Sequence, residues 1–208
     1  RSGPLARIRG RQQALVFLVN HPKALAHHTH QAFAVQHLQL AAPVADQPRH
    51  LQLARLVVDE AVAEEFVAKF AARANELRAG DPAVNPACII GPMISPAHLA
   101  KVRSYIELGP KEGATLLCGG LDQPGYAADL PAHVQNGNFV WPTVFADVDN
   151  RMRIAQEEIF GPVACLIPFK DEADAIAKAN DIEYGLSSYV WTANLGRAHR
   201  VAAAVEAG

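Results

Sequence analysis

From about residue 53 to its end, the chain alternates short apolar runs with segments whose apolar residues recur every three to four positions. The predicted strands are 53–58, 114–118, 163–169 and 187–192, and the predicted helices are 62–77, 95–110, 171–180 and 197–205. Three-to-four spacing lines one face of a helix, and short runs rich in branched residues favour strands. Strands that alternate with helices are typical of parallel sheets covered on both faces. The sequence therefore predicts an α/β fold with a mostly parallel sheet flanked by helices.

Turn-forming residues indicate where the second of these helices begins and ends. Ser95 is a typical N-cap and Pro96 a typical first-turn residue. Gly109 and Pro110 are expected to end the same helix, because neither residue continues a helix well.

Two further stretches carry expectations about burial. The run 114–118 is predicted to be a buried strand. Pro142 interrupts the apolar stretch 139–145 and has no N–H for a sheet ladder, which favours an edge strand or an extended segment. The turn-rich stretch 123–137 is expected to be a loop.

Composition excludes several classes of function. The 208 residues carry a formal charge of −2, without the positive excess of a dedicated nucleic-acid binder. No apolar run reaches the ~18 residues that cross a bilayer, and no secretory signal pattern begins the chain, so we expect a cytoplasmic protein without membrane contact. Cys88, Cys118 and Cys165 are widely spaced in apolar surroundings with no basic residue nearby. We expect them to be structural thiols rather than disulfide partners, zinc ligands or nucleophiles.

Two adjacent carboxylates stand before a predicted strand. Glu157 and Glu158 are followed at once by Phe160 and a Gly-Pro pair. A carboxylate at such a turn can accept hydrogen bonds from both hydroxyls of a ribose, since each oxygen has its own lone pairs. The alternatives are that the acidic pair is a solvated turn and that Phe160 is a core residue, because most carboxylates are exposed.

The hexapeptide Glu157-Glu158-Ile159-Phe160-Gly161-Pro162 resembles the signature of the aldehyde dehydrogenase superfamily, and residues 55–208 are similar throughout to part of its catalytic domain. The resemblance implies that domain's fold, an NAD cofactor, a small aldehyde substrate and a homo-oligomer for complete members. Further strings at 112–117, 129–133, 146–153, 168–173 and 184–192 resemble the branch that acts on 5-carboxymethyl-2-hydroxymuconate semialdehyde in bacterial 4-hydroxyphenylacetate breakdown.

The resemblance also implies roles for single residues. In the family a cysteine thiolate attacks the aldehyde, hydride passes to the nicotinamide, and a glutamate-activated water releases the acid. Glu158 is implied to bind the nicotinamide-side ribose, and Phe160 to lie beside the nicotinamide ring. The nucleophile is expected five residues before Arg55, and that residue is His50. Because an imidazole does not replace the thiolate of a thioester, no catalytic residue is assigned, and we expect this chain alone to be inactive.

Residues 1–54 differ in chemistry from residues 55–208. They hold six basic residues and one acidic residue, a net charge of +5 that leaves −7 for the remainder. No resemblance covers them, and neither a G-x-G-x-x-G motif nor the family's adenosine-binding half is found. We interpret 55–208 as a partial catalytic domain and 1–54 as an out-of-frame or disordered segment.

Two alternatives for residues 1–54 stay open. His27, His28 and His30 could form a metal-binding tract. No carboxylate or cysteine lies nearby in the sequence to complete such a site, which argues against this interpretation. The segment could also be a basic arm for nucleic acid, although its positive residues are dispersed.

For the whole chain two functional classes remain. One is an NAD-dependent aldehyde dehydrogenase by lineage. The other is a non-catalytic, truncated chain that at most associates with complete relatives. Formation of NADH from a semialdehyde distinguishes them.

Overall fold

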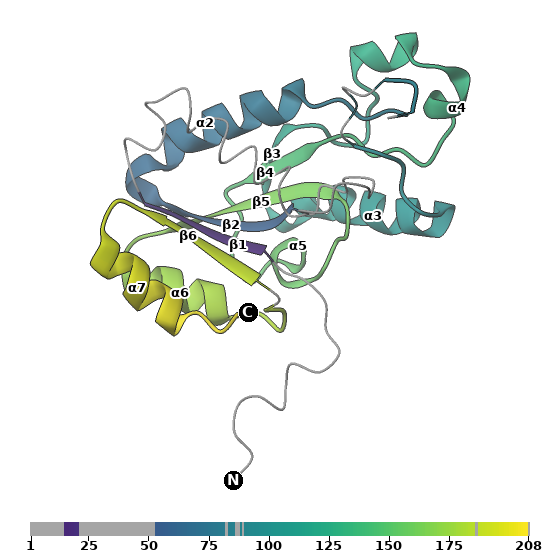
Figure 1. The fold of residues 1–208 in the computed structure, drawn as a ribbon. Helices are drawn as coiled ribbons and strands as arrows, with labels where there is room; N and C mark the ends of the chain where they lie inside the picture. Colours follow the sequence, from purple (N-terminus) through teal and green to yellow (C-terminus); the bar gives the residue numbers. More distant parts are fainter. Residues whose placement is uncertain are drawn as a thin grey trace.

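Six strands form one sheet in the computed structural model, which describes residues 15–20, 53–81, 83–85, 88, 90–185 and 187–207. In spatial order they are β3 (Thr115–Cys118), β4 (Thr143–Ala146), β5 (Pro162–Phe169), β2 (Leu53–Asp59), β1 (Leu15–Asn20) and β6 (Ser187–Thr192) (Figure 1). β3 is antiparallel to β4, whereas the other described neighbours are parallel. The predicted α/β fold with a mostly parallel sheet is confirmed.

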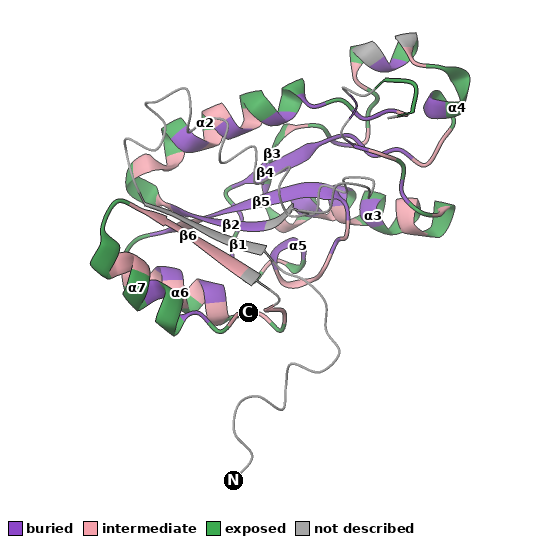
Figure 2. Cartoon of the chain, in the orientation of Figure 1, coloured by how far each residue is buried: buried purple, intermediate pink, exposed green. Residues whose placement is uncertain are grey.

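The central strands are covered on both faces. Seven of the eight residues of β5 are buried, and Figure 2 shows β4 and β5 as the most continuously buried strands. Side chains alternate across a strand. Leu56 and Val58 of β2 therefore join the core cluster beneath one helix, while Val57 joins a cluster on the opposite face.

Helix α2 (Glu60–Glu76) covers the first face. The Asp59 side chain caps it by accepting a hydrogen bond from the Ala61 amide at 2.9 Å. Phe66 and Phe70 are buried against the sheet, with ring centroids 5.8 Å apart. The periodic apolar residues predicted this helix correctly.

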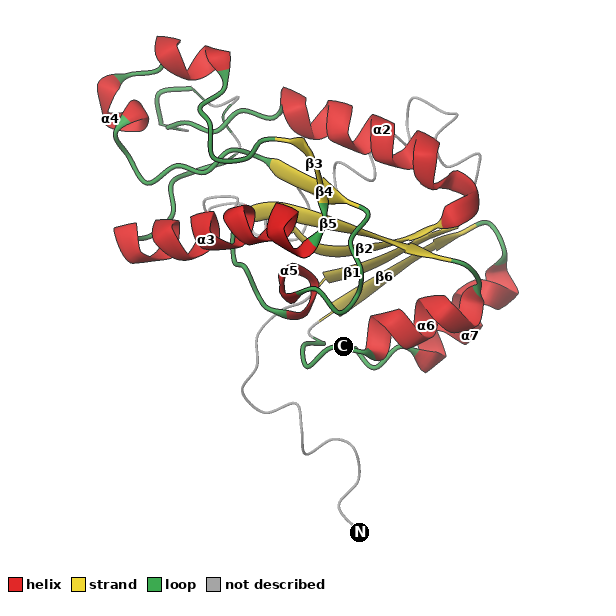
Figure 3. Cartoon of the chain, turned by 180° about the vertical axis from the view of Figure 1, so that it is seen from behind, coloured by secondary structure: helices red, strands yellow, loops and turns green. Residues whose placement is uncertain are grey.

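Helices α3 (Pro96–Glu112), α5 (Arg153–Gln156), α6 (Glu172–Asn180) and α7 (Leu195–Ala204) cover the other face, as Figures 1 and 3 show from opposite sides. Val102 and Ile106 of α3 pack in the same core cluster as Phe145 and Ile167 of the sheet. The side chain of Ser95 caps α3, as predicted.

Helix α3 continues past its predicted end. Gly109 and Pro110 lie inside its last turns, and the helix ends at Glu112. The C-cap is Gly113, whose φ of 102° is left-handed and whose N–H reaches the carbonyls of Gly109 and Pro110. A single proline near a helix end removes only one intrahelical bond, so it does not stop the helix here.

The burial predictions for β3 and β4 were wrong, because the order of the strands in the sheet differs from the order that the local sequence suggested. β3 is the edge strand, with Leu116 42% and Leu117 37% exposed. β4 lies between β3 and β5 and is buried throughout. Pro142 directly precedes β4, so its missing N–H removes no ladder bond and does not force the strand to the edge.

Two further differences concern segments without a predicted element. The expected loop 123–137 contains a 3₁₀ helix, η3 (Gly125–Asp129), and a single turn, α4 (Ala132–Gln135). Residues 1–54 showed no sustained periodicity, yet their run 15–20 forms β1, which pairs in parallel with β2 and β6. The first five residues of this run, Leu-Val-Phe-Leu-Val, are all apolar, so the sequence has no alternation there that would indicate a strand.

Candidate functional site

The acidic turn lies at the amino end of β5. Residues 157–161 connect α5 to β5, whose first residue, Pro162, is in register with Leu53, the first residue of the neighbouring parallel strand β2. The chain therefore enters both strands at the same edge of the sheet. His50 lies outside the described residues, three positions before Leu53.

The backbone of this turn is strained. Phe160 has a φ of 61°, a left-handed conformation that an aromatic residue rarely adopts and that costs on the order of 1–3 kcal/mol. At the next position only glycine fits, since a Cβ on Gly161 would lie 2.6 Å from Cγ1 of Val102 on α3. Surrounding contacts must therefore hold the turn in place.

The carboxylate of Glu157 is occupied by contacts within the chain. Tyr105 on α3 donates its hydroxyl to Oε2 at 2.7 Å. Arg153 on α5 donates Nε to Oε1 at 2.7 Å and Nη2 to Oε2 at 3.0 Å. These donors lower the pKa of Glu157, and burial together with the neighbouring carboxylate raises the pKa of Tyr105 to about 12.

Glu158 has a different environment from its neighbour. Lys101 donates Nζ to the backbone carbonyl of Glu158 at 2.9 Å, and no hydrogen bond from a described residue reaches the Glu158 carboxylate. Partial burial raises the pKa of this carboxyl group, and the nearby Lys101 charge opposes the shift. Glu158 therefore presents acceptor oxygens that no described group uses.

Phe160 lies beside a histidine of α3. The ring centroids of His98 and Phe160 are 6.3 Å apart, with the rings tilted by 59°. Among the described residues, neither ring nitrogen of His98 has a hydrogen-bond partner, and both are buried. Burying an unpartnered imidazole is costly.

Sequence reasoning missed three residues of α3 that face the turn. His98, Lys101 and Tyr105 contact Phe160, Glu158 and Glu157 respectively. They are spaced by three and four positions, which places them on one side of the helix. That spacing of polar residues was a usable signal, although nothing in it identified the partner segment.

The three cysteines are free and have raised thiol pKa values. Burial is the largest cause for Cys88, Cys118 and Cys165, and it raises the pKa of Cys165 to about 12. The expectation that no basic residue lies nearby was wrong for Cys165, because β2 places Arg55 opposite it in register. The Arg55 charge lowers the pKa of that thiol by less than burial raises it.

Arg55 is itself a buried charge at 2% exposure. Its Nη2 donates to Oδ1 of Asn150 and also to the carbonyl of Lys178, the latter at 2.7 Å, and its Nε and Nη1 have no partner among the described residues. Burial lowers its pKa to about 10, and Cys165 and Asp181 oppose that shift. Arg55 therefore connects β2 to the end of α6 and to the segment before α5.

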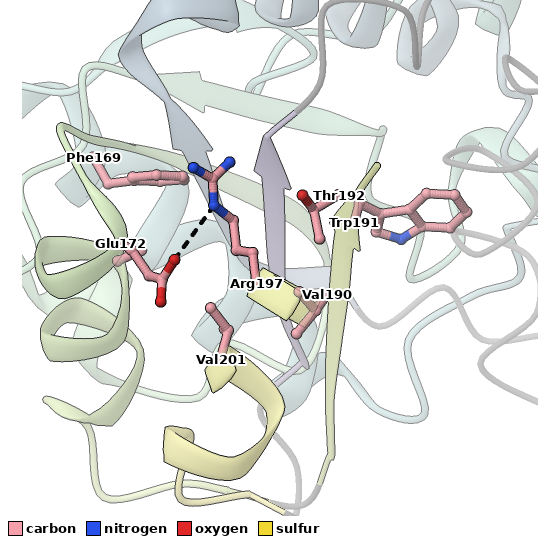
Figure 4. Close-up of a pocket in the computed structure, with 8 residues that line it drawn as sticks. Phe169, Glu172, Val190, Trp191, Thr192, Arg197 and Val201 are labelled. Atoms are coloured by element: carbon pink, nitrogen blue, oxygen red, sulfur yellow. Dashed lines mark hydrogen bonds and ion pairs between the residues drawn. The ribbon is translucent and has the colours of Figure 1, made fainter. Parts of the chain in front are cut away.

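A small cavity lies at the opposite edge of the sheet, where β5 and β6 end. Its volume is about 20 Å³, room for about one water molecule, and its walls include Phe169, Thr192 and Val201 (Figure 4). Glu172 accepts a hydrogen bond from Arg197 at 3.3 Å at its side. This cavity is too small for an organic substrate and is distant from the acidic turn.

Neither a metal cluster nor a membrane helix occurs in the described part of the chain. No group of three or more potential metal-binding side chains was found there, and His27, His28 and His30 lie outside it. Within the same residues, no helix is both long and apolar enough to span a bilayer.

Solved structures of other proteins have a similar fold. The protein HpcC of Thermus thermophilus is 41% identical, with a TM-score of 0.73, and the match covers 96% of this chain and 36% of that one. A Mycobacterium tuberculosis aldehyde dehydrogenase, solved in complex with NAD+, is 35% identical with a TM-score of 0.75, covering 94% of this chain and 37% of that one.

Sequence comparison gives the same family. The 5-carboxymethyl-2-hydroxymuconate semialdehyde dehydrogenase of Escherichia coli is 58% identical over 154 residues, which are 74% of this chain and 32% of that enzyme. The chain thus spans about a third of the length of this relative. The model of the aldehyde dehydrogenase family matches residues 49–208. The family model covers most of the chain, and the solved structures share its fold. The chain therefore belongs to the aldehyde dehydrogenase family.

Proposed function

We propose that the acidic turn of this chain forms the nicotinamide-riboside part of an NAD site. Glu158 accepts hydrogen bonds from the ribose hydroxyls, and Phe160 lies against the nicotinamide ring. The observation that carries the proposal is the contrast between two neighbouring carboxylates. Glu157 already accepts three hydrogen bonds, from Tyr105 and Arg153, whereas the Glu158 carboxylate has no hydrogen bond from a described residue.

The described residues fit such a ligand. A carboxylate accepts two hydroxyls at once through separate lone pairs, and the Glu158 carboxylate accepts no hydrogen bond from a described residue. When bound, NAD would supply the hydride acceptor of an aldehyde oxidation. Glu158 and Phe160 would bind and orient the riboside, and α3 would exclude water from one side of the turn.

The substrate that similarity favours is 5-carboxymethyl-2-hydroxymuconate semialdehyde, oxidised to the carboxylic acid in 4-hydroxyphenylacetate catabolism. Support comes from the 58% identity to the E. coli enzyme of that name. We place this activity in the cytoplasm and in homo-oligomers of complete family members.

A second candidate is a non-catalytic chain, and a specific observation favours it for the chain alone. His50 stands where the resemblance expects the nucleophilic cysteine, and burial raises the thiol pKa of all three cysteines. A raised pKa disfavours the thiolate that attacks an aldehyde. Such a chain acts at most as an association partner of complete relatives.

Two measurements on the purified chain test these proposals. Nicotinamide mononucleotide, titrated into the labelled chain and followed by NMR, should shift the resonances of 158–160, and Glu158→Gln should weaken binding about tenfold. Unchanged affinity in that variant contradicts the riboside site. In the second measurement, NADH formation from the semialdehyde that is abolished by thiol alkylation excludes the non-catalytic alternative; we expect none.

A further inference from the structure

The two adjacent acidic residues have different tasks. We propose that Glu157 is a positioning residue: its carboxylate joins α3 and α5 to the start of the turn and thereby holds Glu158 and Phe160 in place. The effect on ligand affinity rests on the riboside site proposed above, whereas the conformational role does not.

Glu157 has one long-range contact, with α3, and one local contact, with the helix that directly precedes it. Tyr105 reaches it from the third turn of α3, 52 positions away in sequence, and Arg153 reaches it from α5 through two N–H groups. A carboxylate held by one hydroxyl and a two-pronged guanidinium has little freedom to rotate. Glu157 is thus a fixed point from which the turn begins.

The turn needs such a fixed point because its backbone is unfavourable. Phe160 is held at a φ of 61°, and a relaxed turn would return it to a negative φ. α3 contributes two other contacts: Lys101 donates to the Glu158 carbonyl at 2.9 Å, and Val102 packs on Gly161. Glu157 is the residue through which α5 is joined to these contacts.

The opposite assignment, with Glu157 as the ribose ligand, conflicts with the same contacts. Each of its oxygens already accepts a charge-assisted hydrogen bond from Arg153, and Oε2 also accepts one from Tyr105. Oε2 therefore has both lone pairs in use, so binding one ribose hydroxyl on each oxygen would displace a donor from Oε2. Glu158 needs no displacement of a described donor.

The test uses the full 208-residue chain, labelled for NMR, with two independent measurements. The first is the intraresidue amide-to-Hα NOE of Phe160, which is strong at a positive φ and reports the conformation without any ligand. The second is the affinity for nicotinamide mononucleotide. The variants are Glu157→Gln, Tyr105→Phe and Glu158→Gln.

Glu172→Gln is the matched control. Glu172 also accepts three N–H donors from arginines, Arg197 at 3.3 Å and Arg200 at 2.8 Å twice, and it lies beyond the far end of β5. Its loss removes an equivalent ionic contact without touching the turn.

We expect Glu157→Gln to abolish the strong Phe160 NOE and to weaken nicotinamide mononucleotide binding about tenfold. Tyr105→Phe should weaken the NOE as well, and it should weaken binding about threefold. Glu158→Gln should weaken binding but keep the NOE, and Glu172→Gln should change neither. If Glu157→Gln does not fold, Tyr105→Phe, which removes one oxygen atom, carries the test.

The two proposals fail in different ways. A Phe160 NOE and an affinity that stay at wild-type values in Glu157→Gln and Tyr105→Phe overturn the positioning role. Absence of any ligand-induced shift at the turn of the wild-type chain overturns the riboside site instead. In that case the NOE alone still decides whether Glu157 holds the turn.

Discussion

At the scale of single residues, surroundings separate two side chains of the same type. The donors Tyr105 and Arg153 stabilise the charged form of Glu157, so its pKa falls below the ordinary 4.5, whereas burial disfavours the charged form of Glu158 and its pKa rises. Sequence reasoning identified the pair and assigned the binding role to Glu158 by resemblance. The pair with Arg153, four residues earlier, follows a local pattern, whereas the contact with Tyr105 comes from α3 and no local pattern identifies it.

The opposite shifts predict opposite pH dependences of stability. A lowered pKa means that Glu157 stabilises the fold above its unfolded value, and that this contribution is lost as pH falls through the folded pKa. Glu157→Gln should therefore lower the free energy of unfolding at pH 7 by only about 0.5 kcal/mol, because the Glu157 side chain is 38% exposed and its ion pair is screened. The difference should shrink as pH falls below 4.5 and through the folded pKa of Glu157.

Glu158 provides the internal comparison for that prediction. With a raised folded pKa, its charged form destabilises the fold at neutral pH, and the penalty disappears as pH falls below that pKa. Glu158→Gln should be at least as stable as wild type at pH 7, with the gap closing in acid. Urea unfolding at several pH values measures both variants, and parallel pH profiles would contradict the assignment.

The second prediction at this scale concerns Arg55. Arg55→Met removes the donor that serves Asn150 and the Lys178 carbonyl, and leaves those buried acceptors without it. We expect the free energy of unfolding to fall by about 2 kcal/mol. The loss of the two hydrogen bonds is partly offset, because the substitution also removes the cost of burying Nε and Nη1 without a described partner.

Arg151→Met is the control for Arg55→Met. The Arg151 side chain is 86% exposed in its pair with Asp149, so its loss should change stability far less than Arg55→Met does. Equal effects of the two substitutions in chemical denaturation would show that the buried contacts of Arg55 contribute nothing specific.

At the scale of elements, α3 can pack against the turn only because Gly161 has no side chain. Gly161→Ala would place a Cβ 2.6 Å from Cγ1 and 2.9 Å from Cγ2 of Val102. We expect a loss of about 1–3 kcal/mol from overpacking. Val102→Ala in the same chain should recover part of that loss, which a double-mutant cycle measures as coupling.

Gly91→Ala is the matched glycine control, because nothing lies within 4 Å of the added Cβ. Its effect should stay within about 0.5 kcal/mol. Additive effects of Gly161→Ala and Val102→Ala would contradict a direct contact.

Helix starts were more predictable than strand positions. Ser95 marks the start of α3 because its Oγ accepts a hydrogen bond from the His98 amide at 3.1 Å, a contact between close neighbours in the chain. The order of strands in the sheet is not local information. The apolar run at Leu116 and Leu117 was predicted to be buried, but β3 lies at the edge, and β4 after Pro142 lies inside.

At the scale of the whole molecule, β1 connects two parts of the sheet. It pairs with β2 on one side and with β6 on the other, in register from Leu15 with Ser187 to Asn20 with Thr192. Residues 55–208 alone lack this strand. We expect their β6 amides to lose at least about tenfold in hydrogen-exchange protection relative to the full chain, since they lose their ladder partner.

The strand β4 gives the comparison within the same exchange experiment. It pairs with β3 and β5, which residues 55–208 retain, so its protection should be unchanged. Equal protection of β6 in both chains would show that β1 contributes no stability to that edge of the sheet.

Local chemistry in the sequence determined the element types, the α/β class and the signature at 157–162, because periodicity, caps and motifs depend on neighbouring residues. Only the tertiary structure decided that Tyr105 contacts Glu157, that Arg55 lies opposite Cys165, and that β1 lies between β2 and β6. These are contacts between residues far apart in the chain. Their geometry follows from strand order and helix packing, which no local pattern encodes.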